Sequence, residues 1–190
     1  EAVMLGINTI NDTAQYAPEH VGNELSCATC HLEGGTSKGS ISLVGAAATF
    51  PKFSASHATN IDLAQKIQDC FARNLNAAPP AHDSRTMQAL LAYLQWISKD
   101  IPVYANLPWA LPAKLNTTHN ADAKAKKKVY AESCASCHGD AGDGSPPLWG
   151  KGAYSDGSSL HNVDTFAVFT HRFMPPEAAT LTPEQSLDVA

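Results

Sequence analysis

Two Cys-x-x-Cys-His motifs constrain this chain more than any other feature of its sequence. They are Cys27-Ala28-Thr29-Cys30-His31 and Cys134-Ala135-Ser136-Cys137-His138. This pattern is the signature of c-type haem attachment. Two thiols one helical turn apart form thioethers to the two vinyl groups of one porphyrin, and the adjacent imidazole then ligates the iron. The sequence therefore predicts two covalently bound haem c groups, with His31 and His138 as the proximal iron ligands.

Two other uses of paired cysteines fit this sequence less well. A thioredoxin-like redox pair belongs in a βαβ pattern, and a structural zinc site needs a second cysteine or histidine pair nearby. Neither context is visible around the two motifs. Haem attachment is therefore the preferred interpretation of both.

The composition and charge indicate a globular protein that does not bind nucleic acid. Of the 190 residues, 44% are hydrophobic and 16% are charged, which suits one or two domains. The formal charge is −5, and haem propionates would make it more negative, so we expect a redox partner with a basic patch and no binding to nucleic acid.

The same sequence favours a periplasmic or otherwise extracytoplasmic location. No apolar run approaches the roughly 20 residues of a transmembrane segment. The chain begins at Glu1 without a charged and apolar leader, as expected after removal of a signal peptide. Haem is attached to such motifs outside the bacterial cytoplasm, and this chemistry is the stronger argument for the periplasm.

The chain shows one pattern used twice. Each motif is followed by an apolar turn that contains glycine, at residues 43–45 in the first half and 147–150 in the second. Between the halves, Pro102, Pro108 and Pro112 interrupt any helix, and residues 116–120 are polar. We expect an N-terminal cytochrome c domain over residues 1–102, a linker over residues 103–120 and a C-terminal cytochrome c domain over residues 121–190.

Hydrophobic periodicity predicts helices throughout, and strand-like alternation is absent. Apolar residues recur every three or four positions from Ile61 to Leu75 and from Met87 to Ile97, and a further helix is expected from an Asn120 cap into the second motif. The predicted fold is all-α, with two class I cytochrome c-type domains in tandem joined by a Pro-containing linker. A haem at the centre of each core fits the length, because so short a domain has little apolar surface of its own to bury.

Met174 is the candidate distal ligand of the second haem. It lies 36 residues after His138 and precedes two prolines, the arrangement of ordinary class I cytochrome c domains. Thioether ligation stabilises ferrous iron and raises the potential. A methionine that only packs in the core is the alternative. The other candidate ligands are His161, His171 and Lys151.

The first half has no methionine in the place equivalent to Met174, and it offers Cys70, the odd fifth cysteine, instead. An unpaired thiol in an extracytoplasmic protein indicates reactivity or ligation, although a buried cysteine also packs as a small hydrophobe. Lys66 lies four residues before it and Arg73 three residues after it, so both cations share its helical face. We expect these cations to lower the pKa of the thiol and to form a pocket for an anion.

A family resemblance is carried by five segments: residues 16–18, 21–36, 67–76, 89–94 and 147–150. They are similar to the dihaem c-type thiosulfate dehydrogenases, which join two thiosulfates into tetrathionate and are related to the SoxA-type dihaem cytochromes. Some relatives favour the reverse reaction. The resemblance spans nearly the whole chain, and its most specific part surrounds Cys70.

The resemblance implies a catalytic site at the first haem. In that family a cysteine matching Cys70 is the distal ligand of the active-site haem and bonds to substrate sulfur in the mechanism ascribed to these enzymes. His31 and Cys70 would then ligate the catalytic haem, and Lys66 and Arg73 would hold the thiosulfate anions. Family members tend to have Arg where Lys66 stands and Ser where Asn74 stands, so the charge is kept here but a substrate-contacting hydroxyl is not.

The second haem would be the electron exit, with His138 and Met174 as its ligands. Some members place a lysine before the methionine and swap ligands on reduction, but Phe173 stands there in this chain, so that swap is not expected. The resemblance implies an oxidoreductase that passes electrons from a His/Cys haem to a His/Met haem and on to a soluble or membrane-attached partner such as another cytochrome c. Two alternatives stay open: an electron-transfer cytochrome without its own substrate, and a SoxA-like subunit of a sulfur-oxidising complex.

Overall fold

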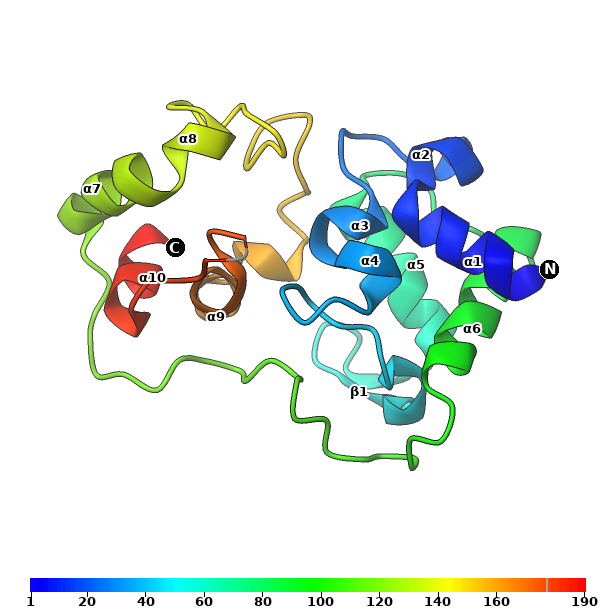
Figure 1. Ribbon diagram of the computed structural model, residues 1–190. Coiled ribbons are helices and arrows are strands. Elements are labelled where there is room, and N and C mark those ends of the chain that lie inside the picture. Colours follow the sequence, from blue (N-terminus) through cyan, green and yellow to red (C-terminus); the bar gives the residue numbers. More distant parts are fainter. Residues whose placement is uncertain (177) are drawn as a thin grey trace. The chain divides into compact units, whose positions relative to one another are not determined.

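The computed structural model describes residues 1–176 and 178–190 (Figure 1). The chain forms two compact units, Glu1–Ala110 and Leu111–Ala190, each of them mainly helical. The predicted all-α class is therefore confirmed. The division between the units falls within residues 103–120. Among the described residues, no helix is long and apolar enough to cross a membrane.

The first unit contains six helices among its described residues. They are α1 (Ala2–Asn11), α2 (Thr13–Tyr16), α3 (Cys27–Cys30), α4 (Leu32–Gly35), α5 (Leu63–Asn74) and α6 (Arg85–Ile97), with 3-10 turns at Pro18–His20 and Ala46–Thr49. Helices α1 and α6 pack against each other. Gly6 permits this approach, because a Cβ there would collide with the carbonyl oxygen of Ala89.

Helices α5 and α6 confirm the two periodic segments of the sequence, and both begin at a side-chain cap. The Asp62 carboxylate accepts a hydrogen bond from the Gln65 amide at 2.8 Å, and the Ser84 hydroxyl accepts one from the Met87 amide at 3.2 Å. Tyr93 of α6 is buried and donates its hydroxyl to a backbone carbonyl of α4 at 2.8 Å. This bond ties α6 to the segment that directly follows the first haem motif.

A short hairpin precedes α5. Strands β1 (Lys52–Ser54) and β2 (Thr59–Ile61) pair antiparallel, with Lys52 opposite Ile61 and Ser54 opposite Thr59. The expectation that strands are absent was wrong at this point. Three residues are too few to show a period-two pattern, and four of the six strand residues are exposed, so no hydrophobic alternation marks these strands.

The second unit contains four helices among its described residues. They are α7 (Ala123–Ser133), α8 (Ala135–His138), α9 (Val163–Phe173) and α10 (Pro183–Val189), with a 3-10 turn at Ser159–His161. Helix α10 packs against both α7 and α9. Its Val189 joins Val129 and Leu181 in a buried apolar cluster.

Helix α7 begins two residues later than predicted. Its cap is Asp122, whose carboxylate accepts from the Lys124 amide at 2.8 Å, and not Asn120. The amide of Asp122 also donates to the Asp188 carboxylate of α10 at 2.7 Å. This long-range bond holds the cap in place, and it cannot be read from the local sequence.

Candidate haem sites and anion site

The first motif is held in a single helical turn. The Ser26 amide donates to the Thr29 hydroxyl at 3.0 Å, which caps α3 at its start. The Cys27 amide donates to the hydroxyl of the fully buried Thr13 at 3.0 Å. These bonds place Cys27 and Cys30 one turn apart, the spacing that two thioethers to one porphyrin require.

Both motif histidines are held in the tautomer that ligates a metal. Nδ1 of His31 lies 2.8 Å from the carbonyl oxygen of Ile41, and Nδ1 of His138 lies 2.8 Å from that of Pro146. A carbonyl oxygen only accepts, so Nδ1 carries the proton and Nε2 keeps its lone pair. Burial lowers the pKa of His31 and so favours its neutral form. The donors at both motifs therefore fit a c-type haem.

The structure brings Cys70 to the first motif, although it lies on a different helix. Burial raises the pKa of Cys27 to about 11 and that of Cys30 to about 12. The charge that Cys70 would carry raises both pKa values further, so the three sulfur groups share one neighbourhood. Among the described residues, none of the five cysteines forms a disulfide bond.

Burial also raises the pKa of Cys70, which corrects the expectation from sequence. Lys66 and Arg73 do lower the pKa of this thiol, but desolvation is the larger effect, and the neighbouring Asp69 carboxylate opposes the two cations. The local charges alone therefore do not make Cys70 a thiolate. Coordination to a metal cation deprotonates a thiol outright and would supply what they lack.

Lys66 is exposed on α5, yet its charge reaches several groups of the site. It lowers the pKa of Cys70, and after burial it contributes to the lowered pKa of His31 and of Lys52. Nothing in the sequence singles out Lys52. It stands on β1, with its ammonium 4.6 Å from the centre of the Phe50 ring, and only the pairing of β1 with β2 brings it near α5.

Arg73 contacts the tip of the hairpin. Its Nη1 donates to the Ser56 hydroxyl at 3.2 Å, while its Nη2 lies 4.0 Å from the Asp69 carboxylate. Asp69 in turn accepts from Nε2 of His57 at 2.9 Å. No sequence motif marks a contact between a hairpin tip and the following helix, so Ser56, His57 and Asp69 could not be picked out from the sequence.

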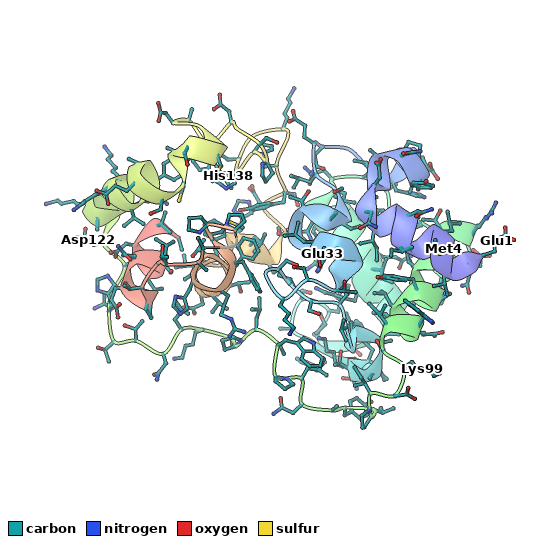
Figure 2. All side chains as sticks on the ribbon, viewed as in Figure 1. Glu1, Met4, Glu33, Lys99, Asp122 and His138 are labelled. Carbon is teal, nitrogen blue, oxygen red and sulfur yellow. The ribbon has the colours of Figure 1, made fainter. Side chains whose placement is uncertain are left out.

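The second motif ends at His138, the last residue of α8 (Figure 2). Cys134 precedes that helix as its cap, and Cys137 is exposed. The Tyr130 hydroxyl donates to the carbonyl of Gly139 at 2.6 Å, which ties α7 to the loop after the motif. Burial raises the pKa of Cys134.

Met174 lies at the end of α9, where its amide donates to the Thr170 carbonyl at 2.9 Å. Its side chain is half-buried and follows the buried Phe173. Among the alternatives, His161 lies 3.6 Å from the Asp156 carboxylate. His171 donates from Nδ1 to a backbone carbonyl at 2.8 Å, as the two motif histidines do. Ligation of the second haem by Met174 therefore stays a prediction, as does the reserve role of Lys151.

Comparisons with known protein families agree with two haem-binding domains. Residues 13–103 match the family model described as SoxA/TsdA, cytochrome c domain. Residues 121–190 match the one described as cytochrome C oxidase, cbb3-type, subunit III. The protein is thus a dihaem cytochrome c, with two tandem cytochrome c domains that bind haem c covalently.

Similar proteins narrow the family to which this cytochrome belongs. A thiosulfate dehydrogenase of Stutzerimonas stutzeri is 38% identical over 184 residues, which cover 92% of this chain and 60% of that protein. One of Allochromatium vinosum is 33% identical over 204 residues, which cover 100% of this chain and 76% of that protein. The chain belongs to the thiosulfate dehydrogenase family.

A solved structure agrees with the assignment. Thiosulfate dehydrogenase (TsdBA) from Marichromatium purpuratum, in its "as isolated" form, matches with a TM-score of 0.92 at 30% identity. The match covers 99% of this chain and 44% of that one. The chain thus spans less than half of that solved protein and less than two thirds of the Stutzerimonas relative.

Proposed function

We propose that this protein is an oxidoreductase that couples two thiosulfate anions to tetrathionate. The observation that carries the proposal is the position of Cys70. This thiol shares the neighbourhood of Cys27 and Cys30, and the Lys66 charge acts on both Cys70 and the proximal His31. A sulfur nucleophile, a haem motif and cations therefore meet in one place. The family membership of the chain supports the same activity.

The iron ligands and attachment sites follow from the same proposal. At the first site His31 and Cys70 would hold the iron, and at the second site His138 and Met174 would do so. The thioether bonds come from Cys27, Cys30, Cys134 and Cys137. When bound, the haems supply one-electron acceptors and, at the first site, the cation that keeps the Cys70 sulfur deprotonated.

Lys66 and Arg73 bind the thiosulfate anions beside Cys70. Two dianions repel each other, and fixed cations offset that repulsion where the charges meet. The Cys70 thiolate forms a sulfur–sulfur bond with the outer sulfur of one thiosulfate. The two electrons released in this oxidation would pass one at a time, through the haems, to the external acceptor. The outer sulfur of a second thiosulfate then attacks the same outer sulfur, which releases tetrathionate and restores the thiolate. The same steps in reverse would reduce tetrathionate.

The location and the electron acceptor are also proposals. A periplasmic site suits two c-type haem motifs, because haem is attached to them outside the bacterial cytoplasm. The formal charge of −5 favours a redox partner with a basic surface, such as another cytochrome c.

A steady-state assay with thiosulfate and ferricyanide tests the proposal. Purified dihaem protein should reduce ferricyanide when thiosulfate is added, and two thiosulfates should disappear for each tetrathionate formed. A cytochrome that only carries electrons would show no thiosulfate-dependent rate. The SoxA/TsdA domain is common to the SoxA-like alternative, which would require a carrier protein for any activity.

A further inference from the structure

We propose that His57 is a positioning residue of the anion site, which acts through Asp69 on the guanidinium of Arg73. The proposal rests on the proposed function, because it concerns how the chain binds thiosulfate. His57 lies in the turn between β1 and β2, outside the segments that carry the family resemblance. Asp69 and Arg73 lie on α5, on either side of Cys70.

The contact between His57 and Asp69 is short and partly buried. Nε2 of His57 lies 3.0 Å and 2.9 Å from the two carboxylate oxygens of Asp69. The side chains are 29% and 12% exposed, so solvent screens this pair less than a surface pair. An ionised carboxylate only accepts, so His57 donates. A hydrogen bond to a charged acceptor is stronger than a neutral one.

This contact keeps Asp69 from pairing closely with Arg73. The two side chains are four residues apart on α5, a spacing that favours a direct ion pair. Instead Nη2 of Arg73 stays 4.0 Å from the carboxylate, and Nη1 donates to Ser56 at 3.2 Å. Gln65 also donates to the same carboxylate, at 3.4 Å. The hairpin tip therefore contacts both side chains: His57 donates to the Asp69 carboxylate, and Ser56 accepts from the Arg73 guanidinium.

The arrangement matters because Asp69 directly precedes Cys70. A carboxylate at this position repels an incoming thiosulfate anion. Without His57, Arg73 becomes the cation best placed to neutralise Asp69. The guanidinium would then be drawn into a tight pair with Asp69 and away from the anion.

The hairpin brings a further cation to the same region. Burial and the Lys66 charge lower the pKa of Lys52 on β1, so the two ammonium groups lie within electrostatic reach of each other. Like charges held close together favour an anion between or beside them. The hairpin therefore belongs to the anion site together with α5.

The first test is His57→Ala in the full, haem-loaded chain. The KM for thiosulfate should rise about tenfold, which corresponds to about 1.4 kcal/mol of lost binding free energy. The turnover number should stay within about twofold, because the change acts on binding and not on the sulfur chemistry. In a Cys70→Ala background, where no covalent step occurs, calorimetric titration with thiosulfate should show a similar loss of affinity.

The double variant His57→Ala/Asp69→Asn separates positioning from mere stability. With no carboxylate left to attract Arg73, the KM should return to within about threefold of the unaltered protein. Failure of this rescue would overturn the proposal. The single variant Asp69→Asn should bind thiosulfate at least as tightly as the unaltered protein, and weaker binding would also overturn the proposal. Because this variant keeps His57, it tests the proposal even if His57→Ala does not fold.

His82→Ala is the matched control. His82 faces Asp62, the cap of the same helix, at 3.6 Å, but these side chains are 64% and 61% exposed. This variant should leave the KM and the affinity for thiosulfate unchanged. If His57→Ala also left both unchanged, the proposal would be contradicted. If the unaltered protein does not oxidise thiosulfate, the proposed function fails. The calorimetric titration with thiosulfate in the Cys70→Ala background still decides the role of His57.

Discussion

The two haem motifs share the hydrogen bond that orients the histidine and differ in the groups that lie beside the cysteines. In both, the histidine donates from Nδ1 to a backbone carbonyl at 2.8 Å. At the first motif burial raises both cysteine pKa values, and a third thiol with nearby cations lies beside them. At the second, Cys137 is exposed and the candidate ligand is a methionine at a helix end. The attachment of the cofactor is thus a local property, whereas its chemistry depends on what another element supplies.

The largest expected effect comes from Cys70→Ala, which would make the first site resemble an ordinary haem site without its thiol. Turnover should fall by about 10³-fold or more, because the nucleophile is lost. Both haems should remain, since attachment depends on the four motif cysteines. A steady-state assay and a pyridine haemochrome titration measure the two results. Undiminished thiosulfate oxidation would rule out the covalent mechanism.

Lys66→Ala should weaken thiosulfate binding without changing the ligands of the first site. We expect a loss of about 1.5 kcal/mol of binding free energy, the lower end of the range for a hydrogen bond to a charged group, because Lys66 is exposed. Lys66→Arg should keep most of the affinity. The KM for thiosulfate and the ferric absorption spectrum are the measurements. Lys38→Ala, at an exposed lysine outside α5, is the control and should change neither.

Met174→Ala should affect only the second site. Loss of a thioether ligand should lower the potential of that haem and remove the weak near-infrared-to-red band of sulfur-ligated ferric haem. Turnover should fall by a smaller factor than in Cys70→Ala, because the nucleophile is intact. A spectroelectrochemical titration measures both potentials. An unchanged spectrum would make Lys151 or His171 the better ligand assignment.

The smallest expected effect is a pH dependence of the second unit. Asp188 accepts from Nε2 of His119 at 2.6 Å and from the Asp122 amide at 2.7 Å, and these bonds lower its pKa. A lowered carboxyl pKa contributes stability above the unfolded value of about 4, and this stability is lost as the pH falls through the folded value. Asp188→Ala should therefore destabilise the protein by about 1 kcal/mol at neutral pH and by less in acid.

Thermal unfolding by circular dichroism at pH 7 and pH 3 measures this difference. Asp140→Ala serves as the control, because that carboxylate is exposed in the same unit. Equal destabilisation by Asp188→Ala at both pH values would contradict the linkage.

The sequence by itself determined the features that arise within a few residues. Two thiols and an imidazole within five positions specify haem attachment, because one helical turn sets their geometry whatever surrounds them. Helices α5 and α6 were predicted for the same kind of reason. Each has a three- and four-residue apolar period and a local side-chain cap, so its limits depend on neighbours in the chain.

Only the tertiary structure decided what surrounds Cys70. Spacing on α5 correctly placed Lys66 and Arg73 near the thiol, but the direction of its pKa depends on burial, which sums over atoms from distant segments. The hairpin is too short and exposed to leave a periodic signal, so its contact with Asp69 through His57 was invisible in the sequence. The start of α7 likewise depends on the bond between Asp122 and Asp188, residues that only folding brings together.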